Sequence, residues 1–103
     1  MELSEIKTLL EGTGLPVAYR MWPEGAAPAL PYLVYFETSN NNFAADGIVY
    51  HRVPGIAIEL YTEKKEPETE CLVEDALSEF FWTKEETYID SEHFYEVRYE
   101  IQV

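Results

Sequence analysis

The chain has 103 residues and is strongly acidic, with seven Lys and Arg against twenty Asp and Glu and a formal net charge of −13. Such a charge repels a phosphate backbone and an anionic membrane surface, which argues against nucleic-acid binding through basic contacts. An apolar fraction of 47% and an aromatic fraction of 15% indicate a globular protein, and the length fits one domain spanning residues 1–103.

Cellular location is constrained by the cysteine content and the hydropathy pattern. The single cysteine, Cys71, supports neither an internal disulfide nor a cysteine-based metal framework. The start of the chain is acidic and lacks a signal-peptide pattern, and no window is long and apolar enough to span a membrane. We therefore expect a protein that is made and folded in a cytoplasm.

The first element expected is a short helix over Ser4–Glu11, where Leu3, Ile6 and Leu10 recur at helical spacing before Gly12. Alternating side chains over residues 17–22 then predict a first strand. A proline-rich loop follows over residues 23–31, and loops of this kind often contact partners.

An unbroken apolar run over residues 30–36 predicts a central strand. Val34 and Phe36 would point to one face, while Leu33 and Tyr35 would point to the other. Because neither face suits water, we expect a helix to cover one face and a second layer, or another subunit, to cover the other.

Three turn signals divide the next stretch of chain: the polar run 39–42, the pair Asp46-Gly47 and the pair Pro54-Gly55. The strands between them would form an antiparallel meander. In the last of these strands Ile56, Ile58 and Leu60 alternate with more polar residues and are expected to face inward.

A second helix is predicted from Pro67, since proline is well suited to the first helical position. Its apolar stripe would consist of Val73, Ala76, Leu77 and Phe80, and its water-facing side of Glu70, Glu74, Asp75 and Glu79. This helix is the expected cover for one face of the central strand.

An edge strand over Thr87–Ile89 and a regular half-buried strand from Tyr95 to Val103 complete the chain as a hairpin. The predicted fold is therefore α+β. It consists of an antiparallel sheet with a central meander and a C-terminal hairpin, and of two helices packed on the sheet.

No catalytic, cofactor-binding or metal site is predicted. His51 and His93 have no metal ligand at a suitable spacing, and Cys71 lies among acidic neighbours and is not expected to act as a nucleophile. Asn40–Asn42 with Asp46 could ligate a hard cation, but the spacing of a calcium loop is missing and a plain hairpin turn is favoured. With twenty carboxylates, a neighbouring pair would be weak evidence for acid–base catalysis.

Aromatic residues are more numerous than one small core requires. Some could line a subunit interface, or they could face one another as cross-strand pairs. Both alternatives are open for a set that comprises Trp22, Tyr32, Tyr35, Tyr50, Tyr61 and Trp82.

Several blocks of this sequence together resemble a family of small prophage proteins of Gram-positive bacteria, encoded among head–tail joining and tail genes. The blocks lie at residues 15–20, 28–35, 45–50, 58–68, 86–89 and 95–97, and span nearly the whole chain.

The resemblance implies a tail-completion protein of the tail-terminator kind. Such a subunit would assemble as a ring, expected to be a hexamer, on the finished end of a tail tube, where it stops tube growth and meets the head connector. Its partners would be further copies of itself, the tail tube protein and the connector. DNA would pass without specific binding, and the protein would reside in the virion. A neck connector or a minor tail component is the alternative role.

Residues in and beside the proline-rich loop and near the hairpin tip are the predicted contacts of such an assembly: Trp22, Pro28, Pro31, Tyr35, Asn41, Phe43 and Asp46. A strand that is apolar on both faces and a surplus of aromatics fit a subunit that buries more surface on assembly.

A second class of function follows from the charge. Residues 59–103 hold fourteen acids and four bases, so an acidic decoy that imitates DNA and inhibits a host DNA-binding protein is an alternative, as is a plainly solvated face. An enzyme, the third class, would require a deep pocket with a perturbed titratable group.

Overall fold

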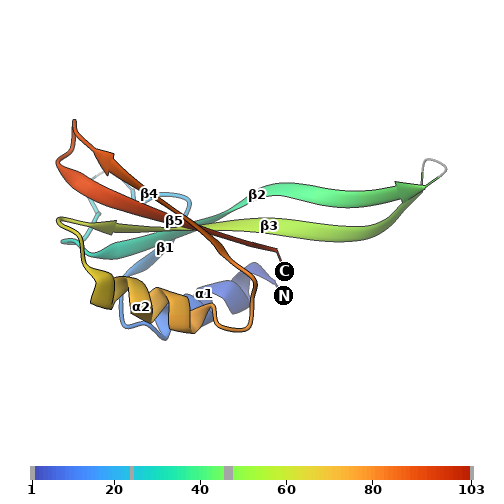
Figure 1. Ribbon diagram of the computed structural model, residues 1–103, viewed down its shortest axis with the longest axis horizontal. Helices are drawn as coiled ribbons and strands as arrows, with labels where there is room; N and C mark the ends of the chain where they lie inside the picture. The colour runs from blue at the N-terminus through green and yellow to red at the C-terminus, as the bar shows by residue number, and fades with distance from the viewer. Residues whose placement is uncertain (1, 24, 46–47, 103) are drawn as a thin grey trace.

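The computed structural model describes the backbone of residues 2–23, 25–45 and 48–102, together with their side chains outside 39–54. The elements are α1 (Leu3–Glu11), β1 (Val17–Tyr19), β2 (Tyr32–Ala45), β3 (Ile48–Thr62), α2 (Pro67–Ala76), β4 (Thr83–Ile89) and β5 (Phe94–Gln102). The strands form one sheet in the order β1-β2-β3-β5-β4. Both helices lie on the same side of it (Figure 1). The α+β class, the C-terminal hairpin and the packing of two helices on the sheet are as predicted.

The core fills the space between this side of the sheet and the helices. β3 contributes Ile56, Ile58 and Leu60, as predicted, and each is at most 2% exposed. The rest of the core consists of Ile6 and Leu10 from α1, Val73 and Leu77 from α2, Leu33 and Tyr35 from β2, and Val97, Tyr99 and Ile101 from β5. Fully burying one such aliphatic side chain stabilises the fold by about 1.5–3 kcal/mol.

Two of the predicted turns are wrong. Residues 39–42 and Pro54-Gly55 lie inside the long strands β2 and β3, where Asn40, Asn41 and Asn42 pair with Pro54, Val53 and Arg52. Register shifts near Glu37 and Phe43 absorb the irregular sequence, so the strands bend without separating. The third predicted turn, Asp46-Gly47, lies outside the described residues.

The outer part of the β2–β3 hairpin projects from the body of the molecule, and we call residues 38–45 and 48–54 the arm. β1 pairs with β2 only as far as Tyr35, and the last described pair of β3 with β5 is Gly55 with Gln102. The described strands of the arm therefore have no third strand beside them (Figure 1). The longest dimension of the molecule is 49 Å.

The first strand is shorter than predicted and runs parallel to β2 rather than antiparallel. It stops at Tyr19 because Arg20 adopts a left-handed backbone with φ 66°. A parallel neighbour requires a connection that crosses over the sheet, and the proline-rich segment between β1 and β2 provides it.

Glu70 was expected to face water, but it is 3% exposed and held by two lysines. Its carboxylate lies 2.8 Å from Lys65 Nζ and 2.7 Å from Lys84 Nζ. Lys84 also lies 2.8 Å from Glu74, and the Tyr99 hydroxyl donates a hydrogen bond of 2.7 Å to the same Glu74 carboxylate. These contacts attach α2 to β4 and β5.

Replacing Glu70 with Gln is expected to lower the free energy of unfolding at pH 7 by about 1–2 kcal/mol, because two partly exposed lysines lose their shared counterion. Burial alone would raise the pKa of Glu70, but hydrogen bonds and charges from Lys65 and Lys84 outweigh burial and lower it. The stabilisation is thus fully present above the pKa of the unfolded chain, about 4.3, and is lost as pH falls through the lower folded value.

Urea unfolding of both proteins at pH 7 and under progressively acidic conditions measures this effect. The matched control is Glu68→Gln, which alters an exposed acid in the same first turn of α2. Equal losses for the two variants, or a Glu70→Gln deficit that persists unchanged in acid, would show that the lysine contacts contribute nothing to stability.

Candidate interaction surface

The side of the sheet opposite the helices, which we call the open face, carries three rows of residues across four strands. Strand register places Thr87, Glu96, Tyr61 and Tyr32 in one row, Glu85, Arg98, Glu59 and Val34 in the second, and Thr83, Glu100, Ala57 and Phe36 in the third. No helix among the described residues covers these rows (Figure 1). Polar and aromatic side chains instead shield part of this face from solvent, and Val34 is only 4% exposed.

A chain of half-buried aromatic rings runs along one margin of the open face. Trp22 meets Tyr32 edge-on at 5.8 Å between ring centroids, Tyr32 lies 5.5 Å from Tyr61, and Tyr61 lies 5.3 Å from Phe94. Each such contact contributes about 0.5–1.5 kcal/mol beyond area burial. Within the described part of the chain, the buried Trp22 Nε1–H has no hydrogen-bond partner.

Cross-strand pairing accounts for some of the surplus aromatics. Tyr32 is directly opposite Tyr61, Tyr19 is opposite Tyr35, and Tyr88 is opposite Tyr95. All three pairs are in ring contact, with centroid distances of 5.5, 5.2 and 4.9 Å. This observation favours the cross-strand alternative for those residues, while the ring edges on the open face stay accessible.

Phe36 lies between two arginines at the opposite margin. The guanidinium carbon of Arg20 is 5.4 Å from the ring centroid and that of Arg98 is 5.5 Å away. Arg98 also lies 3.5 Å from Glu59 and 3.4 Å from Glu100. The left-handed backbone of Arg20 costs about 1–2 kcal/mol for a residue other than glycine, and its backbone N–H donates a 2.7 Å hydrogen bond to the Tyr35 carbonyl.

Two carboxylates meet near the centre of the open face. Glu59 is 9% exposed, accepts a 2.8 Å hydrogen bond from the Tyr61 hydroxyl and has Arg98 beside it. Burial, followed by the neighbouring Glu59 carboxylate, raises the pKa of Glu96 to about 7. Glu96 therefore changes its charge near neutral pH.

Replacing Glu96 with Gln is expected to flatten the pH dependence of stability. Between the unfolded pKa, about 4.3, and the folded value of about 7, the folded protein holds a proton that the unfolded chain has released. The wild-type unfolding free energy therefore falls as pH rises through this window and levels off above it. We expect the fall attributable to Glu96 to be about 1–2 kcal/mol, reduced by its partial contact with solvent.

Urea unfolding across this pH range tests the expectation, with Glu100→Gln as the control because it removes an exposed acid from the same strand. The unfolding free energy of the control should fall with pH as steeply as that of the wild type. If the unfolding free energy of Glu96→Gln fell with pH as steeply as that of the wild type, the proton would not be held by Glu96.

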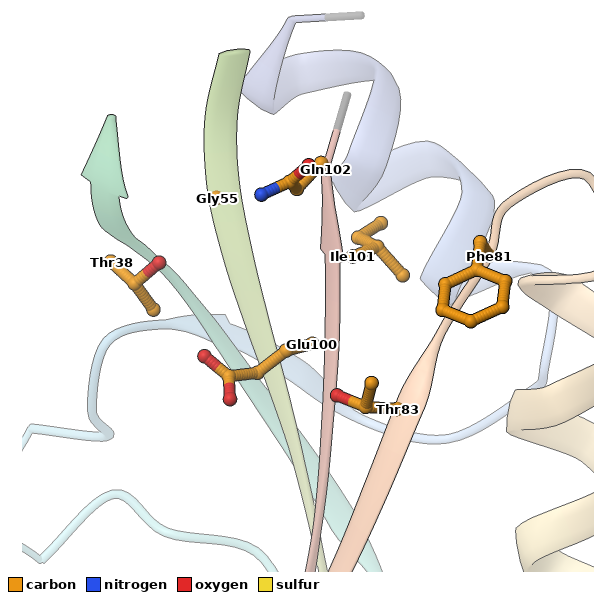
Figure 2. Close-up of a pocket in the computed structure, with 7 residues that line it drawn as sticks. All are labelled: Thr38, Gly55, Phe81, Thr83, Glu100, Ile101 and Gln102. Atoms are coloured by element: carbon orange, nitrogen blue, oxygen red, sulfur yellow. The ribbon is translucent and has the colours of Figure 1, made fainter. Parts of the chain in front are cut away.

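A shallow depression of about 530 Å³ lies at the base of the arm, where β4 begins beside β5. Figure 2 shows Glu100 directed between Thr38 and Thr83, and Ile101 directed toward Phe81. Gly55 and Gln102 complete its lining, and Phe81 is 90% exposed. The described lining holds one carboxylate and two hydroxyls, with no histidine, cysteine or lysine to act as a nucleophile or base.

The structure places the predicted contact residues in different environments. Trp22, Pro28 and Pro31 are half-buried, in or beside the segment between β1 and β2. Tyr35 is 5% exposed in the core, so it does not lie at the surface of the single chain. It faces the helices because its register pairs it with Ile58.

The remaining predicted contacts, Asn41, Phe43 and Asp46, concern the arm. The first two lie on β2, opposite Val53 and His51, with side chains outside the description. Asp46 lies outside the described residues altogether, so the cation hypothesis that joins it to the asparagines also concerns groups outside the described part.

Sequence reasoning missed the residues that give the open face its chemistry. Glu59 and Arg98 are opposite one another, and the same holds for Phe36 and Ala57. The available signal was the alternation of charge along the last strand. That alternation shows which side chains of the last strand share a face, but it does not show which strands lie beside the last strand in the sheet.

The remaining sites considered from the sequence show no assembled centre. In the described ranges, no three His, Cys, Asp or Glu side chains are grouped to hold a metal ion. Cys71 is exposed on α2, and His93 is an exposed turn residue with φ 58°. Neither helix in the described part has the length and apolar character needed to cross a membrane.

Comparison with known proteins adds no relative: no protein-family model matches the chain, and no curated protein matches it.

Proposed function

We propose that this chain is a non-catalytic structural subunit of a bacteriophage tail, of the tail-terminator or tail-completion kind. The proposal joins the resemblance of its sequence blocks to small prophage tail proteins with one structural observation. The body has a finished core on one side of the sheet, whereas no described helix covers the open face and no described third strand pairs with the arm.

Uncovered surfaces of this kind support an assembly role. An isolated two-stranded hairpin is marginally stable in water, and three strands or a packed face are needed for independent stability. Free strand edges also invite pairing with other chains, so soluble proteins normally protect them. In an assembly, neighbouring subunits would pack on the hairpin and pair with or cover its free edges. The proposed neighbours are other copies, the tail tube protein and the head connector.

The charge distribution agrees with a ring through which DNA passes without adhering. Three of the seven basic residues, Lys65, Lys84 and Arg98, are held in ion pairs with acids of the same chain. These ion pairs reduce the number of cations that could hold a phosphate backbone.

The decoy alternative is less favoured because several acids are used inside the molecule. Glu70 and Glu74 are bound by lysines, and Glu59 is bound by Tyr61 and Arg98. A DNA mimic needs its charges displayed toward a basic partner. The neck connector remains the closer alternative role, because it would use the same uncovered surfaces.

Interrupting the gene in the lysogen that carries it and imaging the induced particles by electron microscopy tests the role. We expect filled heads beside unattached tails of irregular and excessive length, because tube growth would lack its stop. Expression of the intact chain from a plasmid is the control and should restore uniform tails.

The other outcomes separate the alternatives. Tails of normal length beside normal heads that fail to join would contradict a terminator and indicate a connector. Intact virions would contradict both roles and favour the decoy, whose binding to a basic host protein should weaken steeply with added salt.

A further inference from the structure

We propose that the arm of one copy packs across the open face of the next copy, which joins the subunits head to tail. The inference deepens the proposed function, in that it names the contact by which copies would associate. It nevertheless stands on the geometry of the chain alone and can be tested without any phage component.

The arm and the open face each lack a second packed layer, and each could provide that layer for the other. The arm is a two-stranded ribbon with no described layer on it, whereas the open face is a four-stranded surface with no helix on it. The core formed by the described side chains lies between the sheet and the two helices. Packing the arm on a neighbour's sheet would give the ribbon the second packed layer that two-stranded hairpins need.

Charge selects the arm over the rest of a second copy as the occupant. Residues 38–54 contain one acid, Asp46, and one base, Arg52, so the remainder of the chain carries the whole net charge of −13. The open face itself is acidic, since its three rows hold four glutamates and one arginine. Another copy's body would bring like charges against it, while the neutral arm would not.

The dimensions also match. The β2 part of the arm, residues 38–45, extends about 26 Å at about 3.3 Å per residue. Four strands at about 4.8 Å spacing make the open face about 14 Å wide between the outer strand axes. The arm is therefore long enough to cross the whole face from β2 to β4.

The contact would be heterologous, because the arm and the open face are different surfaces of the same chain. Each copy gives one arm and receives one, so association continues until a ring closes or a filament forms. A two-fold dimer in which arm meets arm is a different arrangement, and the experiment below distinguishes the two.

Two variants each remove one side of the contact. In the arm-deleted variant, an Asn-Gly turn replaces residues 39–54 and joins Thr38 to Gly55, which leaves the described core intact. In the face variant, Thr87→Arg places a large cation on the exposed β4 position of the first row. Thr8→Arg, at an exposed position on α1, is the matched control for charge and size.

We expect the wild type and Thr8→Arg to associate beyond dimers in sedimentation velocity, and the two variants to sediment as monomers with body folds that unfold cooperatively. A mixture of the variants should form a one-to-one complex that does not grow, because one partner keeps its face and the other keeps its arm.

A third variant keeps the arm at full length in case the deletion does not fold. Val49→Glu with Tyr50→Glu adds two acids to β3 in the arm, so that the neutral arm becomes acidic. It should behave as the arm-deleted variant does, because the added acids would meet the glutamates of the open face.

Three results would overturn the inference: association of the arm-deleted variant, a variant mixture that forms no complex, or a wild type that stays monomeric. A monomeric wild type combined with overlong tails after gene interruption would remove the arm contact and leave the proposed function in place. If the variants formed the expected complex but the interrupted gene left virions normal, the arm contact would stand and the proposed tail function would be contradicted.

Discussion

The structure depends on the segment of β2 from Tyr32 to Phe36, which is apolar on both faces. β2 directs Leu33 and Tyr35 toward the helices, and it directs Val34 and Phe36 the opposite way. The helices satisfy the first requirement, so that side contains a dry and continuous core. The second requirement is met only by neighbouring rings, two arginines and a crossing segment. The two sides of one sheet thus differ in how much burial the single chain can provide, and this difference is what makes the open face a candidate surface.

The elements that the sequence predicted well are those whose burial follows a local period. The alternation that ends at Ile101 and the inward set on β3 need no knowledge of partners. Turn chemistry failed at the asparagine run and at Pro54-Gly55, because pairing between two long strands overrode local preference and register shifts absorbed the mismatch. Glu70 was misplaced for a related reason: its lysines come from a loop and from β4. The side-chain contacts on the open face could not be foreseen, because they arise from strands that are neighbours in the sheet and distant along the chain.

The many acids of this chain have two distinct uses. Those on α2 act as structural ligands for lysines and a tyrosine, and they attach a helix to a sheet edge. Those on the open face lie close enough to oppose one another, which keeps a proton on Glu96 near neutral pH. Formal net charge therefore overstates how much negative potential the surface displays. An acidic composition by itself is a weaker indication of DNA mimicry than it first suggests.

Because the arm lies away from the body, selection for folding and selection for partner contact act on different parts of the sequence. The two hairpins form from local contacts, but the core closes only when β5 reaches β3 and α2 folds over them, which is the long-range and slow step of such a topology. The far ends of β2 and β3 project beyond the last described pair of β3 with β5 (Figure 1). Sequence changes there lie outside the described contacts that close the core. Selection can therefore reshape the arm to follow a changing partner while the folding of the domain is left undisturbed.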